Sequence, residues 1–315
     1  MGKQVVDTSM SNLTHQFTNL AGKDGVTMKD ILLQSIKNTK KELIGNNNGY
    51  HFLITGNSTD ILKKLPDDSI DLIVTDPPYN KGLDYGSYYN DNKAWKDYFV
   101  EMKMWLIEAN RVLRKTGTLY LISYPEINAR LLPFIEDELA LKFRRWITWH
   151  YPTNIGHSKK NFTRSQRSIL FFTKSNNYVF NEENIIQPYK NPTVAKIKER
   201  IRLGSKGRHS YDLLNLLDMI ELNKDMIDVI DINLLKNVSK DRFNKKHPCQ
   251  LPLSLLRILV KVSSNKNDVL LDPFAGTFTL SAVAKELGRN SIGIDLNPQY
   301  VKLGLKRLKT NQVLL

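Results

Sequence analysis

The chain has 315 residues, 41% of them hydrophobic, with a single cysteine and a net charge of +14. This length permits one large or two modest domains, and the lone cysteine excludes an internal disulfide and a cysteine-rich zinc site. No apolar run reaches the roughly 20 residues of a membrane span, and no signal-peptide core is visible, so we predict a cytoplasmic protein without a membrane anchor. The six histidines show no metal-ligand spacing, and we predict no metal. The excess of 46 Lys and Arg over 32 Asp and Glu suits a polyanionic partner, although a lysine-rich proteome would give the same balance.

Residues 1–49 form a polar segment that ends in the glycine- and asparagine-rich run 45–49, which predicts a linker. Within this segment, Thr27 and Asp30 have the spacing of a helix N-terminus, and apolar residues follow at near-helical spacing. We therefore expect an N-terminal extension with one helix that docks on the protein or contacts a partner. A frayed terminus fits the same pattern equally well.

Residues 50–175 alternate between apolar runs of strand length and stretches with helical periodicity. The expected elements are strand 51–54, helix 60–65, strand 70–74, a long helix with an apolar face from Phe99 to Leu113 that Gly117 closes, strand 118–122, helix 131–141, and strands 146–149 and 168–172. Such alternation predicts an α/β fold with a largely parallel sheet.

The strand predicted at 70–74 runs directly into Thr75-Asp76-Pro77-Pro78-Tyr79-Asn80. The two prolines have fixed φ angles and donate no backbone N–H, so their carbonyls stand as hydrogen-bond acceptors. Asp76 adds a carboxylate acceptor, and Tyr79 adds a flat aromatic face. Acceptors beside an aromatic ring suit an exocyclic amino group in the plane of a nucleobase. The plainer interpretation is a strand that ends in a proline turn with a capping aspartate.

Between residues 176 and 246 the periodicity weakens and the composition becomes polar and basic, which predicts an insertion. The α/β pattern resumes over residues 247–315. Its expected elements are helix 253–262, strand 269–271, helix 277–287, strand 291–294 and a last helix after Pro298. The chain is thus divided into an extension, two halves of one α/β domain, and an insertion between those halves.

A second motif, Asp272-Pro273-Phe274-Ala275-Gly276-Thr277, lies between a predicted strand and a predicted helix. A strand, a glycine-containing turn and a helix N-terminus form the nucleotide-cofactor crevice of doubly wound folds. Asp295 follows Gly276 by about 20 residues, the spacing at which such folds place an acid on ribose hydroxyls. The phosphate-binding Gly-x-Gly-x-x-Gly pattern is absent, so a cofactor with ribose and no pyrophosphate fits better than NAD.

With Asp76-Pro77-Pro78-Tyr79 upstream of Asp272-Pro273-Phe274-Ala275-Gly276, the chain resembles the permuted, β-class amino-group DNA methyltransferases. These enzymes depend on S-adenosylmethionine and usually belong to restriction-modification systems. The resemblance covers most of residues 52–309 and includes a segment, 247–252, that is similar to the family's His-Pro-Thr-Gln-Lys-Pro. It implies a Rossmann-like fold, with a mostly parallel sheet, helices on both faces and a target-recognition region at 176–246.

The resemblance also implies functional residues. The catalytic residues would be Asp76, Pro77, Pro78 and Tyr79, with Tyr79 stacking on a base flipped out of the duplex. The cofactor-binding residues would be Asp272, Pro273, Phe274, Ala275, Gly276, Thr277, Asp295, His247, Gln250, Asn57 and Thr75. Three positions depart from the family pattern: Asn57 replaces a frequent aspartate, Phe278 replaces a glycine, and Gln166-Arg167 replaces a His-Glu pair.

Double-stranded DNA is the partner that the resemblance implies, and basic residues near the catalytic motif and in two basic stretches are expected to contact it. These residues are Lys81, Lys159, Lys160, Arg164, Arg167 and Arg208. A homodimer and functional pairing with a restriction endonuclease are further expectations from the family. We favour adenine N6 as the target, because Asp-Pro-Pro-Tyr is associated more often with adenine N6 and Ser-Pro-Pro-Tyr with cytosine N4. Cytosine N4, RNA or protein glutamine as substrate, and a nucleic-acid-binding module with an inactive cofactor pocket stay open as alternatives.

Overall fold

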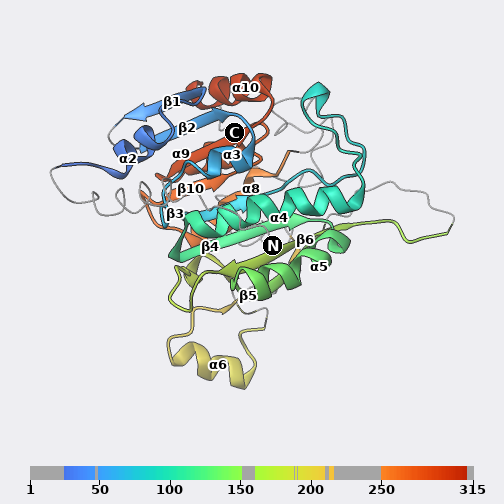
Figure 1. Ribbon diagram of the computed structural model, residues 1–315. Coiled ribbons are helices and arrows are strands. Elements are labelled where there is room, and N and C mark those ends of the chain that lie inside the picture. Colours follow the sequence, from blue (N-terminus) through green and yellow to red (C-terminus); the bar gives the residue numbers. More distant parts are fainter. Residues whose placement is uncertain are drawn as a thin grey trace.

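The computed structural model describes residues 25–46, 49–150, 160–187, 189, 191–209, 213–215 and 250–310. Its centre is a sheet of nine strands (Figure 1). In spatial order these are β1 (Lys41–Asn46), β2 (Gly49–Thr55), β11 (Asn290–Asp295), β10 (Val269–Asp272), β3 (Ile70–Thr75), β4 (Leu113–Ser123), β6 (Gln166–Thr173), β5 (Lys142–His150) and β9 (Leu213–Asn215). The run from β2 to β4 is parallel throughout, whereas β1 and β6 are antiparallel to their neighbours.

Helices cover both faces of the sheet. One face carries α2 (Met28–Ser35), α3 (Ser58–Leu62), α4 (Trp95–Val112) and α5 (Pro125–Pro133), and the other carries α8 (Leu253–Ser263), α9 (Thr279–Glu286) and α10 (Pro298–Lys309). Because side chains alternate across a strand, Ile73 of β3 packs under the first group of helices, and Leu72 and Val74 pack under the second. This arrangement confirms the predicted α/β class. Among the described residues, no helix is both long and apolar enough to cross a membrane.

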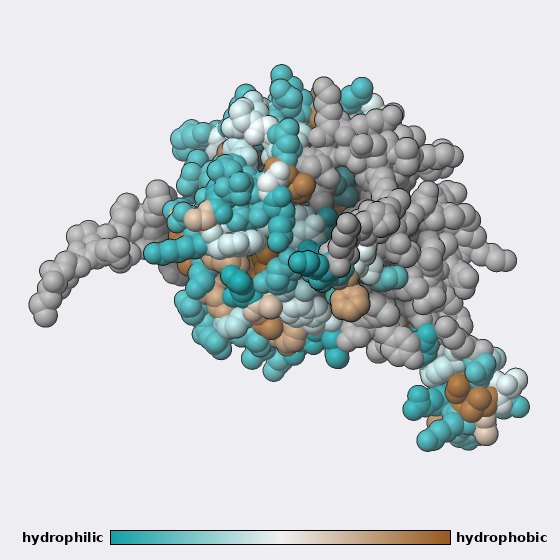
Figure 2. All heavy atoms as spheres, turned by 90° about the vertical axis from the view of Figure 1, so that its right-hand side faces the viewer, coloured by the Kyte–Doolittle hydropathy of each residue, from teal (hydrophilic) through white to brown (hydrophobic). Residues whose placement is uncertain are grey.

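A small lobe lies beyond the β5 edge of the sheet (Figure 1). It holds α6 (Ala195–Arg202) and a two-stranded sheet of β7 (Ile186–Gln187) and β8 (Arg208–His209). Figure 2 shows this lobe standing apart, largely hydrophilic with a small apolar patch. Its exposed apolar residues are Val194, Ile201 and Leu203. These elements belong to the predicted insertion, as does β9, which pairs with β5 in the main sheet.

The linker predicted at 45–49 is wrong. β1 and β2 form an antiparallel hairpin whose register runs from Lys41 opposite Ile54 to Asn46 opposite Gly49. Gly45 has φ +115°, and a side chain there would collide with the Gly49 carbonyl. Gly45 therefore permits close strand pairing, and the described end of the predicted extension belongs to the main sheet. The helix predicted after Thr27 is confirmed, with Thr27 and Asp30 forming a reciprocal capping box.

Two helix boundaries also differ from the predictions. α4 ends at Val112, and Gly117 lies inside β4, where Leu113 and then Thr118 to Leu121 pair with β3 on either side of an irregularity. The strand therefore begins at Leu113, and the helical pattern that continues to this residue does not reveal the pairing. The helix predicted at 131–141 instead begins at Pro125 and ends in a π-helical turn, Phe134–Glu138. Pro125 occupies the first helical turn, where its missing N–H is tolerated.

Phe278, one of the departures from the family pattern, has a structural role. It adopts a left-handed conformation, φ 58°, at the start of α9, and its side chain is fully buried. The ring packs against Gly293 of β11 and Gly304 of α10, so that a Cβ at Gly293 would lie 2.6 Å from it. Two glycines thus provide the space that this phenylalanine needs, on the side of α9 that faces α10.

Gly304→Ala is expected to destabilise the fold by about 1–3 kcal/mol, because the added methyl overlaps the Phe278 ring in a closely packed core. Thermal unfolding measures the effect, with Gly49→Ala as the control because a Cβ at Gly49 meets nothing within 4 Å. In a double-mutant cycle, Phe278→Ala should cost less stability in the Gly304→Ala background than alone. Equal melting temperatures for Gly304→Ala and wild type would contradict this packing.

Candidate active site

The two sequence motifs meet at the carboxyl edge of the sheet. β3 and β10 are adjacent parallel strands, with Leu72 opposite Leu270, so the residues that follow them lie side by side. The Thr75 hydroxyl at the end of β3 donates a hydrogen bond of 3.0 Å to Asp272 Oδ1 at the end of β10. This contact joins the Asp-Pro-Pro-Tyr turn to the Asp-Pro-Phe-Ala-Gly turn, as parallel pairing requires.

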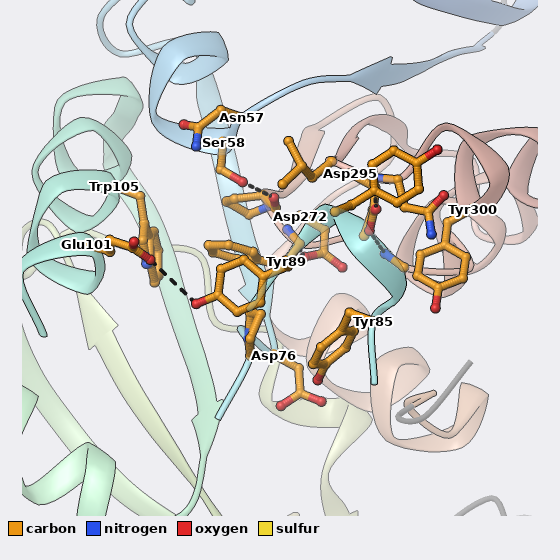
Figure 3. Close-up of a pocket in the computed structure, with 18 of the residues that line it drawn as sticks. Asn57, Ser58, Asp76, Tyr85, Tyr89, Glu101, Trp105, Asp272, Asp295 and Tyr300 are labelled. Atoms are coloured by element: carbon orange, nitrogen blue, oxygen red, sulfur yellow. Dashed lines mark hydrogen bonds between the residues drawn. The ribbon is translucent and has the colours of Figure 1, made fainter. Parts of the chain in front are cut away.

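A cavity of about 470 Å³ opens at this edge (Figure 3). Its walls come from the start of α3, the loop after β3, one face of α4, the segment before α8, the β10–α9 turn and the end of β11. The predicted site residues that line it are Asn57, Asp76, Pro78, Gln250, Asp272, Pro273, Phe274, Ala275, Gly276, Thr277 and Asp295. Pro77, Tyr79 and Thr75 are buried beside the cavity, and His247 lies outside the described residues.

Asp295 is held at the cavity wall by backbone N–H groups. Its Oδ2 accepts the Gly276 N–H at 2.8 Å, and its Oδ1 accepts the Asn297 N–H at 2.8 Å. Burial raises the pKa of Asp295 to about 7, although these two hydrogen bonds act to lower it. A carboxylate oxygen has two lone pairs, so each oxygen can also accept a ligand hydroxyl.

Asp272 lies deeper in the same cavity. Its Oδ1 accepts the Phe274 N–H at 3.1 Å as well as the Thr75 hydroxyl. Burial raises the pKa of Asp272 to about 7, and the neighbouring Asp76 and Asp295 add to the rise. The cavity thus gathers three carboxyl groups from three strand ends, and this arrangement favours a ligand with positive charge.

Asp76, the third carboxyl group, is nearly buried and accepts a hydrogen bond from the Tyr79 hydroxyl at Oδ1. Burial raises the pKa of Asp76 to about 6, although the charge of Arg167 and the Tyr79 hydrogen bond both act to lower it. The ring of Tyr79 has no exposed surface. Tyr124 lies 4.7 Å from it between ring centroids, and the Arg167 guanidinium lies 4.8 Å from it. The face expected to stack on a base is therefore covered in this structure.

Aromatic residues of the loop after β3 and of α4 also line the cavity. Tyr85, Tyr88 and Tyr89 come from the loop after β3, and Tyr89 donates to Glu101 of α4 at 3.5 Å. Trp105 of α4 meets Phe274 edge-on, with 5.3 Å between ring centroids. Trp105 belongs to the apolar face of α4, where an aromatic residue is indistinguishable in sequence from a core residue.

Asn57 and Gln250 both border the cavity. The Asn57 side chain caps α3 by accepting the Asp60 N–H at 3.3 Å. Gln250 is buried at the opposite wall. Ser58, next to Asn57, donates to the Pro273 carbonyl at 2.5 Å and so ties α3 to the β10–α9 turn.

The residues predicted to contact DNA fall into three groups. Lys81 and Arg164 converge on Glu126, with N–O distances of 3.3 and 2.8 Å, and both lie over the Tyr124 ring beside the catalytic turn. Lys160 is exposed, Arg208 belongs to β8 in the lobe, and Lys159 lies outside the described residues. Arg167 is only 5% exposed and points toward Tyr79 and Asp76. The prediction of a phosphate contact at Arg167 is therefore corrected, because a phosphate cannot reach a buried guanidinium.

A strand-end cavity with an acid on β11 and the Asp-Pro-Pro-Tyr turn on β3 defines the class of S-adenosylmethionine-dependent methyltransferases. The model of the DNA methylase family that covers N6 and N4 enzymes matches residues 70–306. The chain belongs to this family of DNA methyltransferases. Among the part of the chain that the structure describes, no group of three or more His, Cys, Asp or Glu side chains could hold a metal ion.

Relatives and solved structures agree with this membership. The chain is 34% identical over 257 residues to "Type II methyltransferase M.HpaI" of Haemophilus parainfluenzae, covering 81% of this chain and 73% of that protein. It is 34% identical over 262 residues to "DNA adenine methyltransferase YhdJ" of Escherichia coli K12, covering 81% and 82%. The fold is similar to that of the cytosine-N4-specific PvuII DNA methyltransferase, with TM-score 0.59, 18% identity, and coverage of 84% of this chain and 88% of that one. The S-adenosylmethionine complex of M1.HpyAVI gives TM-score 0.54 at 19% identity, covering 81% and 98%.

The cavity fits the cofactor of this family, S-adenosylmethionine. The molecule carries positive charge on its sulfonium and its amino group, and the carboxyl groups of Asp76, Asp272 and Asp295 are among those that border the cavity. It also carries ribose hydroxyls, which are donors, and Asp295 offers carboxylate oxygens that two backbone hydrogen bonds hold in place. The side chain of Phe278 packs toward Gly293 and Gly304 and leaves the cavity clear, so the loss of the family's glycine does not fill the site.

Proposed function

We propose that this DNA methyltransferase modifies the N6 amino group of adenine, with Asp76 and the Pro77 carbonyl as acceptors for that amine. The observation that carries the proposal is the position of Asp76 and Pro78 in the wall of the same cavity as Asp295. The Pro78 carbonyl already accepts the Tyr98 hydroxyl at 2.8 Å, which favours the Pro77 carbonyl as the backbone acceptor. The name of the relative YhdJ and the Asp-Pro-Pro-Tyr sequence both support adenine.

The proposed chemistry depends on making a weak nucleophile reactive. The lone pair of an exocyclic nitrogen is delocalised into the base, and two acceptors for its N–H groups favour the tetrahedral nitrogen that can attack. S-adenosylmethionine supplies a methyl group on a sulfonium, so that an N–C bond forms as the S–C bond breaks and its electron pair stays on sulfur. In this proposal, Asp76 would take the proton that the nitrogen then loses. Preorganised acceptors and close placement of the reactants supply the acceleration.

The proposed cofactor site consists of residues from the second motif and its neighbours. Asp295 would bind the ribose hydroxyls, and Phe274 with Asn57 would border the adenine. Asp272, Thr277 and Gln250 would face the methionine part. Thr75 would act indirectly, by holding Asp272 with its hydroxyl. We retain Pro273, Ala275 and Gly276 as the backbone of this turn, and His247 remains a prediction from sequence.

DNA would approach the side of the cavity that carries the catalytic turn. Lys81 and Arg164 are next to that turn, and both form ion pairs with Glu126. We propose that on DNA binding these two side chains leave Glu126 and contact backbone phosphates instead. The lobe with α6 and Arg208, together with the rest of residues 176–246, is our candidate for sequence reading in the major groove.

A base within a duplex must be flipped to reach Asp76, which costs a few kcal/mol. Pairing with a restriction endonuclease, a homodimer and a cytoplasmic location stay predictions.

The target base is tested by methylating a duplex of mixed sequence and mapping the modified bases at single-nucleotide resolution. N6-methyladenine within one short sequence is the expected product. N4-methylcytosine would overturn the adenine proposal, and the fold similarity to a cytosine-N4 enzyme makes that the second candidate. Label in RNA or protein and none in DNA would contradict the substrate class. The same protein with Asp76→Asn, prepared identically, controls for methyltransferases of the expression host.

A further inference from the structure

Arg167 lies beside the catalytic turn although it comes from a distant strand. It is the second residue of β6, where it pairs with Trp149 of β5. Its guanidinium lies over the Tyr79 ring at 4.8 Å and within 5.6 Å of the Tyr124 and Trp149 rings. Its Nη1 lies 3.8 Å from Asp76 Oδ2, within ion-pair distance. With 5% exposure, the residue is part of the interior.

Asp76 is therefore contacted from both sides. The Tyr79 hydroxyl donates to Oδ1, and the Arg167 guanidinium faces Oδ2. The same guanidinium covers one region of the Tyr79 ring, so it constrains the phenol that donates to Asp76. A planar cation can stack on an aromatic ring and pair with a carboxylate at the same time, whereas an ammonium group cannot do both equally well. A buried carboxylate also needs an opposite charge to stay ionised.

We infer that Arg167 is a positioning residue for methyl transfer, which keeps the Asp76 carboxylate ionised and, through Tyr79, directed toward the cavity. The inference rests on the proposed role of Asp76 as the acceptor for the base amine. Arg167 itself would not touch the substrate, because it does not line the cavity and reaches it only through its contact with Asp76, which does.

The titratable groups that interact with Asp76, apart from Arg167, are Tyr79 of the same turn, Asp272 of β10 and Tyr98 of α4, and Asp295 of β11 interacts with Asp272. Asp76 raises the pKa of Asp272, so the two carboxylates repel each other, and burial also disfavours the charged form of Asp76. The Tyr79 hydrogen bond favours the charged form, less strongly than Arg167 does. Arg167 is the cation that opposes these effects at Asp76.

The test is the pH dependence of single-turnover methyl transfer to a duplex, measured with saturating S-adenosylmethionine for wild type, Arg167→Met and Arg167→Lys. Wild-type activity should fall as the pH falls through about 6, because Asp76 has a pKa of about 6 and acts in its ionised form. Loss of a neighbouring arginine raises a carboxyl pKa by about 1–3 units. For a rise of one to two units, the rate of Arg167→Met at about pH 6.5 should fall about 3- to 25-fold, and it should approach its maximum by about pH 9.

Arg167→Lys separates charge from stacking. The lysine keeps the positive charge, so the fall in activity at low pH (the acid limb of the pH profile) should stay within about half a pH unit of wild type. The maximal rate of this variant should fall, because the planar stacking on Tyr79 is lost. Arg144→Met is the matched control. Arg144 also stacks on an aromatic ring, 4.7 Å from Tyr178, but it lies within β5 and does not line the cavity. Its pH profile should equal that of wild type.

Equal acid limbs for wild type and Arg167→Met would overturn the inference, and so would an Arg167→Lys limb that moves by a full unit. Should Arg167→Met fail to bind S-adenosylmethionine or to unfold cooperatively, Arg167→Gln tests the same loss of charge with a hydrogen-bonding side chain. Asp76→Asn separates a failure of the proposed role of Asp76 from a failure of the role of Arg167. If that variant methylates DNA at the wild-type rate, the proposed function of Asp76 fails. If it is inactive and Arg167→Met keeps the wild-type limb, only the role of Arg167 fails.

Discussion

Asp76→Asn is expected to lower the rate of methyl transfer by about 10²–10⁴-fold and to leave cofactor affinity nearly unchanged. Asparagine has almost the same shape, but one of its two terminal groups donates hydrogen bonds, and its oxygen carries no charge. The amine of the base would then lose a charged acceptor at the moment its nitrogen becomes tetrahedral. The cofactor would keep its contacts at Asp295 and in the β10–α9 turn, which do not involve Asp76.

The measurement pairs single-turnover methylation of a duplex with calorimetric titration of S-adenosylmethionine. Asp67→Asn serves as the control, because Asp67 forms an ion pair with Arg111 outside the cavity and its loss should leave the rate intact. A fall in cofactor affinity that equals the fall in rate would show that Asp76 belongs to cofactor binding and not to the acceptor site.

Asp295→Ala has the second largest expected effect, a rise of about 10- to 100-fold in the dissociation constant of S-adenosylmethionine. A hydrogen bond to a charged group contributes about 1.5–3 kcal/mol, and the variant would lose the one that a ribose hydroxyl donates to the Asp295 carboxylate. It would also leave the N–H groups of Gly276 and Asn297 without this acceptor, which loosens the turn that borders the cavity. Asp295→Asn, which keeps one oxygen acceptor, should lie between wild type and alanine.

Calorimetry again measures the effect, with Asp268→Asn as the matched control. Asp268 also accepts a backbone N–H, that of Asn265 at 2.7 Å, but it lies at the start of β10, away from the cavity. An unchanged dissociation constant in Asp295→Ala would contradict the ribose assignment. A loss of affinity in Asp268→Asn of similar size would instead indicate a general effect on the β10–α9 unit.

The positions of both motifs could be predicted because each depends on local sequence. A β-branched run that ends in Pro77-Pro78 must stop there, and a strand followed by Gly276 must turn tightly, whatever the rest of the chain does. Parallel strands place their carboxyl ends on one edge, so the meeting of Asp76 with Asp272 and Asp295 followed from the predicted fold class.

Three of the features that were mispredicted have related causes. The glycines at 45 and 49 looked like a linker because their composition does not reveal that Leu43 pairs with Phe52. The apolar periodicity of α4 continues to Leu113, and only its pairing with Ile70 shows that this residue starts a strand. Arg167 looked like a surface cation because it follows a basic run, and its burial depends on Tyr79 and Asp76, about 90 residues away in the sequence.

From its sequence alone, this protein is predictable as a methyltransferase with two motifs at neighbouring strand ends, since strand breaks, turns and helix starts are decided by nearby residues. The tertiary structure decided which groups surround those motifs: Arg167 and Tyr124 around Tyr79, the aromatic residues of α4 and the β3 loop in the cavity wall, and Gly293 with Gly304 around Phe278. These contacts join residues far apart in the chain, and their energies depend on burial and on the distance between charges, neither of which is present in a linear pattern.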